Sequence, residues 1–214
     1  MTPFASGLNF YKLFWIFFIG CFIGVVIEEL WCMVRYRKIE SRKGLIYGPF
    51  NLVYGFGALI ITVSLIWFSD KRDIVIFAFG AAIGGVYEYL CSALQEKFLG
   101  SISWNYQRLP FSLNGRINLL YCFFWGLLAI FWIKDLYPYV SALVERIPNN
   151  IGVPLTYALL FFMVLNSLIS ALAVYRMSIR KTKHRTNAFW DYIDNKYPDE
   201  KMEKIYPNMQ FVRK

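Results

Sequence analysis

Five stretches of mainly apolar residues follow one another along this chain, and they restrict the fold more than any other feature. A helix that crosses the hydrocarbon core of a bilayer needs about 20 such residues, and each stretch is close to that length. The sequence therefore predicts an all-α integral membrane protein with five transmembrane helices. The expected spans cover residues 13–34, 50–68, 74–94, 117–133 and 153–175.

The composition agrees with this prediction, because 57% of the residues are hydrophobic and 17% are charged, whereas a soluble domain has about 45–50% and 25%. Residues 1–175 form the expected transmembrane domain. Residues 176–214 are too polar to cross a membrane and are expected to form a basic cytoplasmic tail. Between the fourth and fifth stretches, residues 135–150 have a mixed pattern that is typical of a short amphipathic helix in the membrane interface.

The distribution of Lys and Arg predicts the orientation in the membrane. Cytoplasmic loops of membrane proteins carry an excess of these residues. The first loop, the third loop and the tail together contain 18 of the 23 Lys and Arg residues, whereas the N-terminal segment and the even loops contain five. We therefore expect a multi-pass protein of the cell membrane with its N-terminus outside and its C-terminus in the cytoplasm.

The remaining composition excludes several classes of function. The net charge of +9 is concentrated in loops beside the predicted spans, which fits contact with anionic lipid and no nucleic-acid partner. The four cysteines lie in apolar stretches without CxxC spacing, and the single histidine lies in the tail, so we expect no metal centre and no cofactor. The chain also lacks the GxxxxGK[ST] loop that binds ATP phosphates, so any ATPase must be a separate partner.

The first four spans contain an internal repeat. The segment GCFIGVVIEEL, from Gly20, and the segment GAAIGGVYEYL, from Gly80, are identical at six of 11 positions. Further along, NLVYGF from Asn51 corresponds to NLLYCF from Asn118. We therefore expect spans one and two to be repeated in parallel as spans three and four, with a fifth span after them.

Both copies of the repeat contain a glutamate in the pattern Gly-xxx-Gly-xxx-Glu. Positions four apart lie on one side of a helix, and small residues at this spacing let membrane helices approach closely. We expect the first span to pack on the third along these glycines, with the glutamates facing each other. Two facing carboxylates would share a proton, bind a cation or require an arginine. The residues concerned are Gly20, Gly24 and Glu28 in one copy and Gly80, Gly84 and Glu88 in the other.

The loops after the first and third spans supply further candidates for a polar site that opens to the cytoplasm. Asn51 and Asn118 each begin a span, where the side chain either caps the helix or contacts a substrate. Arg116 is the nearest expected counter-charge for the two glutamates, or else an interfacial residue. The other candidates are the polar and aromatic residues Tyr54, Trp104, Asn105, Tyr106, Asn114 and Tyr121.

Several of these segments resemble one known family of bacterial inner-membrane proteins. The segments IEELW, GLIYGPFNLVYGFG and EKFLGSISWNYQRLPFSLNGRINLLYCFFWGL are similar to the "putative ABC-transporter type IV" family, whose members are often called ABC transporter permeases. The resemblance runs over about residues 20–128 and implies a role in transport. The family usually has an aspartate where this chain has Asn105, so this chain departs from the family there and a role that needs a charge at this position is not expected.

Three classes of function remain open. A transport protein or permease-like subunit with so few spans would form a homo-oligomer or join other membrane subunits, besides the separate ATPase. A membrane-embedded enzyme would act on a lipid-linked or amphipathic substrate at the cytoplasmic leaflet, with the glutamates as acid and base. No nucleophile with a base partner is evident, so we favour a protein that is not an enzyme. The third class is a non-catalytic membrane scaffold or regulator that binds a partner through its tail.

Overall fold

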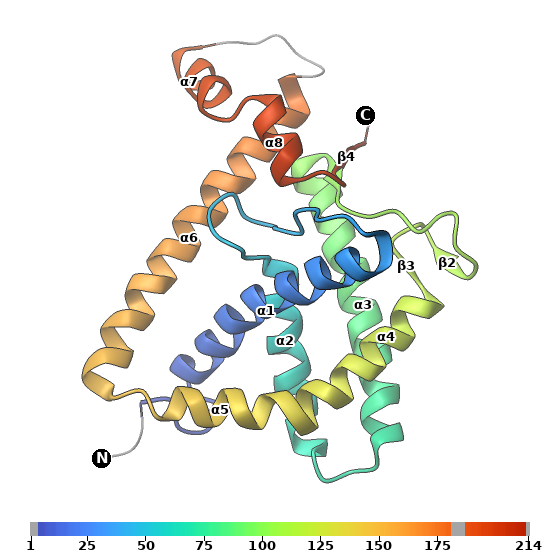
Figure 1. Ribbon diagram of the computed structural model, residues 1–214, viewed down its shortest axis with the longest axis vertical. Helices are drawn as coiled ribbons and strands as arrows, with labels where there is room; N and C mark the ends of the chain where they lie inside the picture. The colour runs from blue at the N-terminus through green and yellow to red at the C-terminus, as the bar shows by residue number, and fades with distance from the viewer. Residues whose placement is uncertain (1–3, 181–186, 213–214) are drawn as a thin grey trace.

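The computed structural model describes residues 4–180 and 187–212, most of them in long helices (Figure 1). Within these residues, four helices are long and apolar enough to cross a membrane. A fifth apolar helix, α2 (Leu52–Leu65), continues into the short 3-10 helix η1 (Ile66–Phe68). The prediction of a mainly helical membrane protein is confirmed at this level. The four long helices are α1 (Phe10–Tyr36), α3 (Asp73–Leu99), the continuous helix Leu119–Glu145 and α6 (Asn149–Arg180).

The fourth apolar segment forms a longer helix than the sequence predicts. It joins α4 (Leu119–Ile130), the π-helix η2 (Phe131–Leu136) and α5 (Tyr137–Glu145) without a break. Pro138 has no backbone N–H and would clash with a carbonyl of the preceding turn. The π turn directly before it widens the helix at this point. The helix therefore runs past residue 133, the predicted end of the fourth span, and residues 135–145 continue it instead of forming a separate short helix.

A buried lysine fastens α5 to the beginning of α1. The Lys12 side chain is completely buried, and its Nζ donates to the Oγ and carbonyl oxygen of Ser141 and to Oε1 of Glu145. An unpaired ammonium group in apolar surroundings is costly, so Lys12 holds the end of the fourth helix in place. Earlier in the same helix, the indole Nε1 of Trp132 donates to Oγ1 of Thr62 in α2 over 2.7 Å.

The first glycine pattern packs against α2. A Cβ atom added at Gly20 would lie 2.8 Å from Cβ of Ala58. One added at Gly24 would lie 2.2 Å from the side chain of Tyr54. Real Cβ atoms do not approach so closely, so the two glycines allow α1 and α2 to touch.

The second glycine pattern packs in the same way against α4. A Cβ atom added at Gly80 would lie 2.3 Å from Cβ of Ala129, and one added at Gly84 would lie 2.4 Å from the indole of Trp125. Each pattern therefore faces the next helix of its own copy. The expectation that the first and third spans pack along these glycines is wrong, because the space beside each pattern is already filled by a neighbouring helix.

The two helix pairs are similar but differ in register. Tyr54 and Trp125, which face equivalent glycines, lie 71 residues apart in the sequence. Asn51 and Asn118, which cap α2 and α4, lie only 67 residues apart. Four residues correspond to about one helical turn. The second pair is therefore offset by about one turn from the first, which brings a tryptophan to the position that a tyrosine occupies in the first pair.

The loop between α3 and α4 contains a small antiparallel hairpin, which the sequence prediction of an all-α protein missed. It pairs β2 (Ser112–Leu113) with β3 (Ile117–Asn118). Asn114 and Gly115, in the turn, have φ angles of 54° and 71°. Two left-handed residues in succession are typical of a two-residue hairpin turn, for which Asn-Gly is the strongest sequence signal.

The described part of the tail is folded against the rest of the chain. Helices α7 (Ala188–Lys196) and α8 (Asp199–Ile205) pack on the end of α6, which continues to Arg180 instead of ending near residue 175. The strand β4 (Gln210–Phe211) then pairs with β1 (Ser101–Ile102), directly after α3. The most basic part of the expected tail, residues 181–186, lies outside the described residues.

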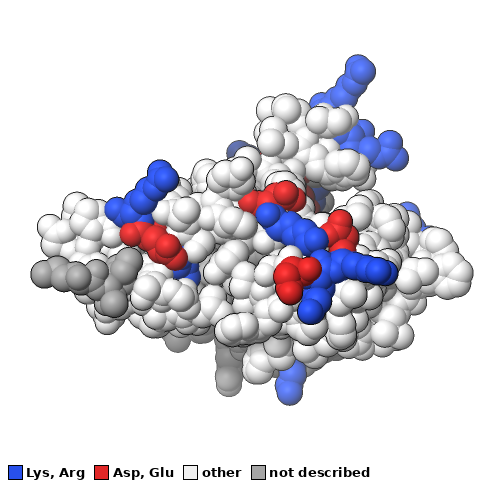
Figure 2. Space-filling model, turned by 90° about the horizontal axis from the view of Figure 1, so that it is seen from below, with Lys and Arg blue, Asp and Glu red and all other residues white. Residues whose placement is uncertain are grey.

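Apolar side chains cover much of the outer surface of the long helices. Trp67, Val86 and Phe161 are each more than 60% exposed, and the face shown in Figure 2 is mostly uncharged, with its charged side chains in small groups. A soluble monomer rarely exposes so much apolar surface. The exterior therefore fits contact with lipid.

Candidate functional site

Glu88 is a buried carboxylate in the apolar helix α3. The residue is 7% exposed, and both of its carboxylate oxygens accept a hydrogen bond. The hydroxyl of Tyr106 donates to Oε1 over 2.8 Å, and the indole Nε1 of Trp125 donates to Oε2 over 2.7 Å. A buried polar group is costly unless it is hydrogen-bonded, so these two donors allow the carboxylate to stay in the interior.

Both donors to Glu88 are held by aromatic contacts. The ring of Tyr106 stacks on that of Tyr121, with centroids 4.2 Å apart. The ring of Tyr87 meets Trp125 edge to face, and its hydroxyl donates to the carbonyl of Val53 in α2. The candidates Glu88, Tyr106 and Tyr121 therefore come together in one cluster. The sequence analysis missed Trp125, although it stands four residues after Tyr121 and thus on the same face of its helix.

Glu28, on α1, lies near enough to Glu88 for the two carboxylates to act on each other electrostatically. Its side chain is 34% exposed, so it is the more open member of the pair. Nε of Arg42 lies 3.7 Å from Oε1 of Glu28. The glutamates therefore belong to one site although the glycines beside them do not bring their helices together.

Arg42 is the counter-charge that the sequence analysis did not identify. Its guanidinium also donates to Sγ of Cys32 and lies 3.4 Å from Oε2 of Glu40, so it is held by several groups. The side-chain amide of Asn51 donates to the backbone carbonyl of Arg42 over 3.1 Å. Asn51 thus positions the arginine loop in addition to capping α2, where its Oδ1 accepts from the N–H of Val53.

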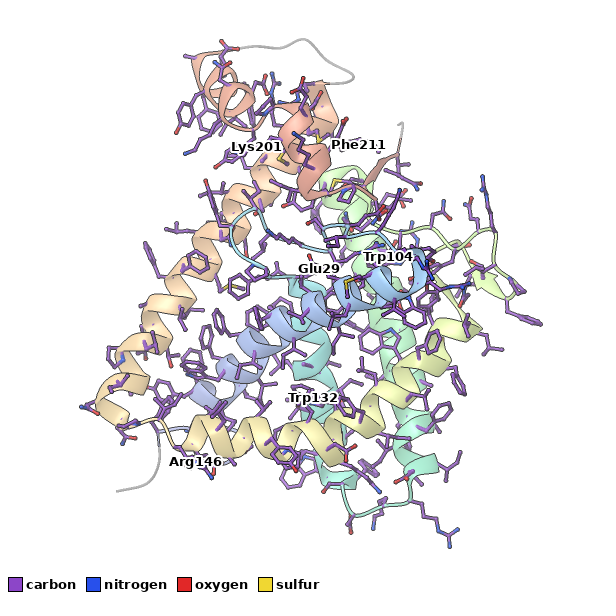
Figure 3. The ribbon with its side chains drawn as sticks, in the orientation of Figure 1. Glu29, Trp104, Trp132, Arg146, Lys201 and Phe211 are labelled. Atoms are coloured by element: carbon purple, nitrogen blue, oxygen red, sulfur yellow. The ribbon has the colours of Figure 1, made fainter. Side chains whose placement is uncertain are left out.

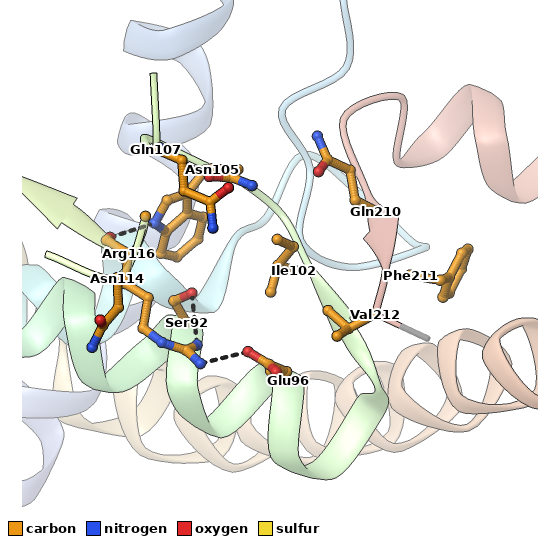
Figure 4. A pocket seen from close by; sticks show the side chains of 12 residues that line it. Ser92, Glu96, Ile102, Asn105, Gln107, Asn114, Arg116, Gln210, Phe211 and Val212 are labelled. Carbon is orange, nitrogen blue, oxygen red and sulfur yellow. Dashed lines mark hydrogen bonds and ion pairs between the residues drawn. The ribbon is translucent and has the colours of Figure 1, made fainter. Parts of the chain in front are cut away.

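Arg116 does not pair with either glutamate of the site. Its guanidinium donates to Oε2 of Glu96 over 2.5 Å and to Oγ of Ser92 over 3.3 Å, both on the last turns of α3. The hairpin between α3 and α4 directs the arginine back toward the end of α3 (Figure 4). The expectation that Arg116 neutralises Glu28 or Glu88 is therefore wrong, because a nearer carboxylate takes its charge.

The residues around Arg116 line a separate polar hollow of about 420 Å³ (Figure 4). Its wall contains four of the predicted candidates, Trp104, Asn105, Asn114 and Arg116 itself, together with Gln210 from the docked tail. The indole of Trp104 donates to the backbone carbonyl of Arg116, and the amide of Asn114 donates to the hydroxyl of Tyr89. The structure thus places most of the predicted candidates either in a cluster around Glu88 or in this hollow.

Two further candidates have structural contacts outside both groups. Asn118 is 2% exposed, and its Oδ1 caps α4 by accepting from the N–H of Tyr121. Its side-chain Nδ2 makes no hydrogen bond among the described residues. Tyr54 packs against Gly24. Asn118 therefore caps a helix, and Tyr54 forms part of the contact between α1 and α2.

The site lies in the half of the molecule that also carries the hairpin and the tail. In Figure 3, Glu29, the neighbour of Glu28, lies close to Trp104, whereas Trp132 and Arg146 lie toward the opposite end. Within the described residues, no group of three or more His, Cys, Asp or Glu side chains is arranged to hold a metal ion. What the arrangement offers chemically is one buried carboxylate with two neutral donors beside a second carboxylate with an arginine.

The helices and the buried cluster define a multi-pass helical membrane protein with ionisable groups between its apolar helices. A family model described as "Putative ABC-transporter type IV" matches residues 15–171, so the chain belongs to this family. Searches of the curated proteins and of the solved structures give no match.

Proposed function

We propose that the protein is a membrane transport protein or permease-like subunit with an inward-facing polar site built around Glu28 and Glu88. The observation that carries this proposal is the position of Glu88, a buried carboxylate in a membrane-type helix that lies within electrostatic range of a second carboxylate on another helix. Ionisable side chains between membrane helices are costly and mark substrate or ion pathways. The family of ABC-transporter type IV proteins supports the same class of function.

In this proposal the chain crosses the bilayer five times, with its N-terminus outside and its C-terminus in the cytoplasm. The helices alternate in direction, and α1, α3 and α6 all run toward the end that carries the tail (Figure 1). The second crossing is Leu52–Phe68, which is about 25 Å long and requires local thinning of the bilayer. The basic first loop and the folded tail then lie in the cytoplasm, and the site opens on that side.

The first four crossings form a parallel repeat of two helix pairs. The equivalent glycine contacts of Gly24 with Tyr54 and of Gly84 with Trp125 support this repeat. Five crossings are few for a complete transporter, so the protein works as a homo-oligomer or with other membrane subunits. The sequence has no phosphate-binding loop of the ATPase type, so any ATPase that acts with it is a separate subunit.

Downhill flux through purified protein tests the proposal. Liposomes that contain the protein are loaded with a mixture of amino acids, monosaccharides, nucleosides, Na⁺ and K⁺, and release of each component is followed by mass spectrometry. We expect release of at least one component above that from protein-free liposomes, and a loss of tenfold or more in Glu28→Gln and Glu88→Gln.

Glu29→Gln is the matched control, because Glu29 is adjacent on the same helix and accepts a long hydrogen bond of 3.3 Å from the N–H of Arg42. Retention of every component by wild-type liposomes would contradict transport by this protein on its own. So would equal release by the wild type and by a folded Glu28→Gln/Glu88→Gln double variant, which would instead favour a scaffold or regulator.

A further inference from the structure

The two glutamates of the site differ in their charge partners. Glu28 has a cation beside it, because the guanidinium of Arg42 lies 3.7 Å away. No ion pair to Glu88 is found among the described residues, and both of its partners, Tyr106 and Trp125, are neutral. With both glutamates ionised the site would carry one uncompensated negative charge in apolar surroundings, which is unfavourable.

The hydrogen bonds of Glu88 can accommodate a proton on one oxygen only. The indole N–H of Trp125 can donate but not accept, so Oε2 must remain an acceptor. The hydroxyl of Tyr106 can both donate and accept. A proton on Oε1 would therefore keep both contacts, because the carboxylic acid would donate to the oxygen of Tyr106, and Tyr106 would keep its own proton and turn it away.

We propose that Glu88 is the proton-binding group of this site and that the proton is the ion coupled to transport, while Glu28 stays ionised beside Arg42. This inference rests on the proposed function. Glu88 alternates between a carboxylate that accepts from Tyr106 and an acid that donates to it. In the protonated state the pair of glutamates and the arginine are together electrically neutral.

The surroundings of Glu88 favour the binding of a proton over the binding of a metal cation. Hard cations bind oxygen atoms whose lone pairs point toward them. At Glu88 the indole N–H and the tyrosine hydroxyl already occupy these positions over 2.7 and 2.8 Å. A cation bound to both oxygens would compete with both donors for the carboxylate lone pairs, whereas a proton only reverses one of the two hydrogen bonds.

Two of the titratable groups near Glu88, Tyr106 and Arg42, do not offer a competing proton site, and the competing carboxylate Glu28 is separated from Glu88 by the variants described below. Burial raises the pKa of Tyr106, and the charge of Glu88 raises it further, so Tyr106 keeps its proton and serves as a donor or acceptor. Arg42, whose charge faces Glu28, remains protonated. The groups that act on Glu88 are Glu28 of α1, Tyr106 of the loop, Tyr121 and Cys122 of α4, and Tyr87 and Cys91 of its own helix.

Infrared difference spectroscopy of the whole protein in lipid nanodiscs tests this inference. As the pH is lowered from alkaline to acidic values, we expect a band from the C=O stretch of a protonated carboxyl group. The band should be absent in Glu88→Gln and present in Glu28→Gln. In Tyr106→Phe it should move to higher frequency, because the carboxyl group loses a hydrogen bond.

Glu88→Gln is expected to fold, since its amide oxygen can accept from Trp125 while its amide N–H donates to Tyr106. A band lost in Glu28→Gln but kept in Glu88→Gln would overturn the inference, as would a spectrum in which no band depends on Glu88. If flux depends on the glutamates but the spectrum contains no such band, the proton is not the coupled ion, and the proposal of transport stands. The band without any flux would refute transport and leave protonation of Glu88 standing.

Discussion

Trp125 joins two features of the molecule within one side chain. Its indole ring lies against Gly84, and its Nε1 donates to Glu88. The glycine therefore does more than allow two helices to touch, because it leaves room for the donor that stabilises the buried carboxylate. In the first helix pair the equivalent contact is made by Tyr54, and Glu28 is stabilised by Arg42 instead.

This connection makes Gly84→Ala a test of packing and of the site together. The added methyl group would meet the indole of Trp125 at 2.4 Å, so the ring must move and its hydrogen bond to Glu88 should be lost. Overpacking of this kind costs about 1–3 kcal/mol. We expect a lower midpoint of thermal unfolding in detergent and a change in tryptophan fluorescence. Ala82→Val, which adds carbon on the exposed side of the same helix, should change neither; unchanged fluorescence in Gly84→Ala would contradict the contact.

At the scale of helices, the pairing of α3 with α4 can be tested with a single cysteine. A Cβ atom built at Gly85 lies 3.9 Å from Cβ of Cys122, a separation suited to a disulfide. Gly85→Cys should therefore form a disulfide with the native Cys122 in membranes treated with an oxidant. Mass spectrometry after thiol alkylation would detect the loss of two reactive thiols. Ala82→Cys on the exposed side serves as the control, and two free thiols in oxidised Gly85→Cys would show that the helices pair differently.

The helices could be predicted because each depends on a continuous stretch of the sequence. Long apolar stretches near 20 residues specify crossings wherever they occur, and the class of protein follows from them. The helix that ends at Glu145 was harder to predict, because Lys134, Asp135 and Pro138 interrupt the apolar pattern. Its continuation depends on contacts with distant residues, such as the bond between Glu145 and Lys12.

The candidate site was predictable only in part, for a similar reason. Glu28 and Glu88 stand out because carboxylates are rare in apolar stretches, but their partners come from loops whose path the sequence does not reveal. Arg42 is one of five positive residues in its loop, and nothing in the pattern separates it from the others. The Asn-Gly pair at residues 114–115 was an available signal for the hairpin, which directs Arg116 toward Glu96.

At the scale of the whole molecule, the tail is held by a charge pair that responds to pH. Arg176, 2% exposed, donates to both oxygens of Asp194, and Arg180 donates to the same carboxylate. The hydrogen bond from Arg176 holds the pKa of Asp194 below its usual value of 3.8. The free energy that this carboxylate contributes to docking of the tail is fully present above pH 3.8. It is lost as the pH falls through the lower pKa of Asp194 in the docked state.

Asp194→Asn should therefore loosen the tail at neutral pH. Removing the carboxylate that pairs with the buried guanidinium of Arg176 costs roughly 3 kcal/mol. We expect faster hydrogen exchange over residues 188–212, measured by mass spectrometry, and little change in the helices of the transmembrane domain. Glu200→Gln, an exposed residue of α8, is the control, and unchanged exchange in Asp194→Asn would show that apolar contacts alone hold the tail.

The pairing of β1 with β4 has a consequence for the order in which the protein is built. Strand β1 follows α3 directly, but its partner is made only after the two remaining long helices, Leu119–Glu145 and α6, have been synthesised. A newly made chain must therefore insert its last helix before this sheet can close. Until then the wall that Gln210 and Phe211 supply to the polar hollow is missing, so the hollow is completed last during biogenesis.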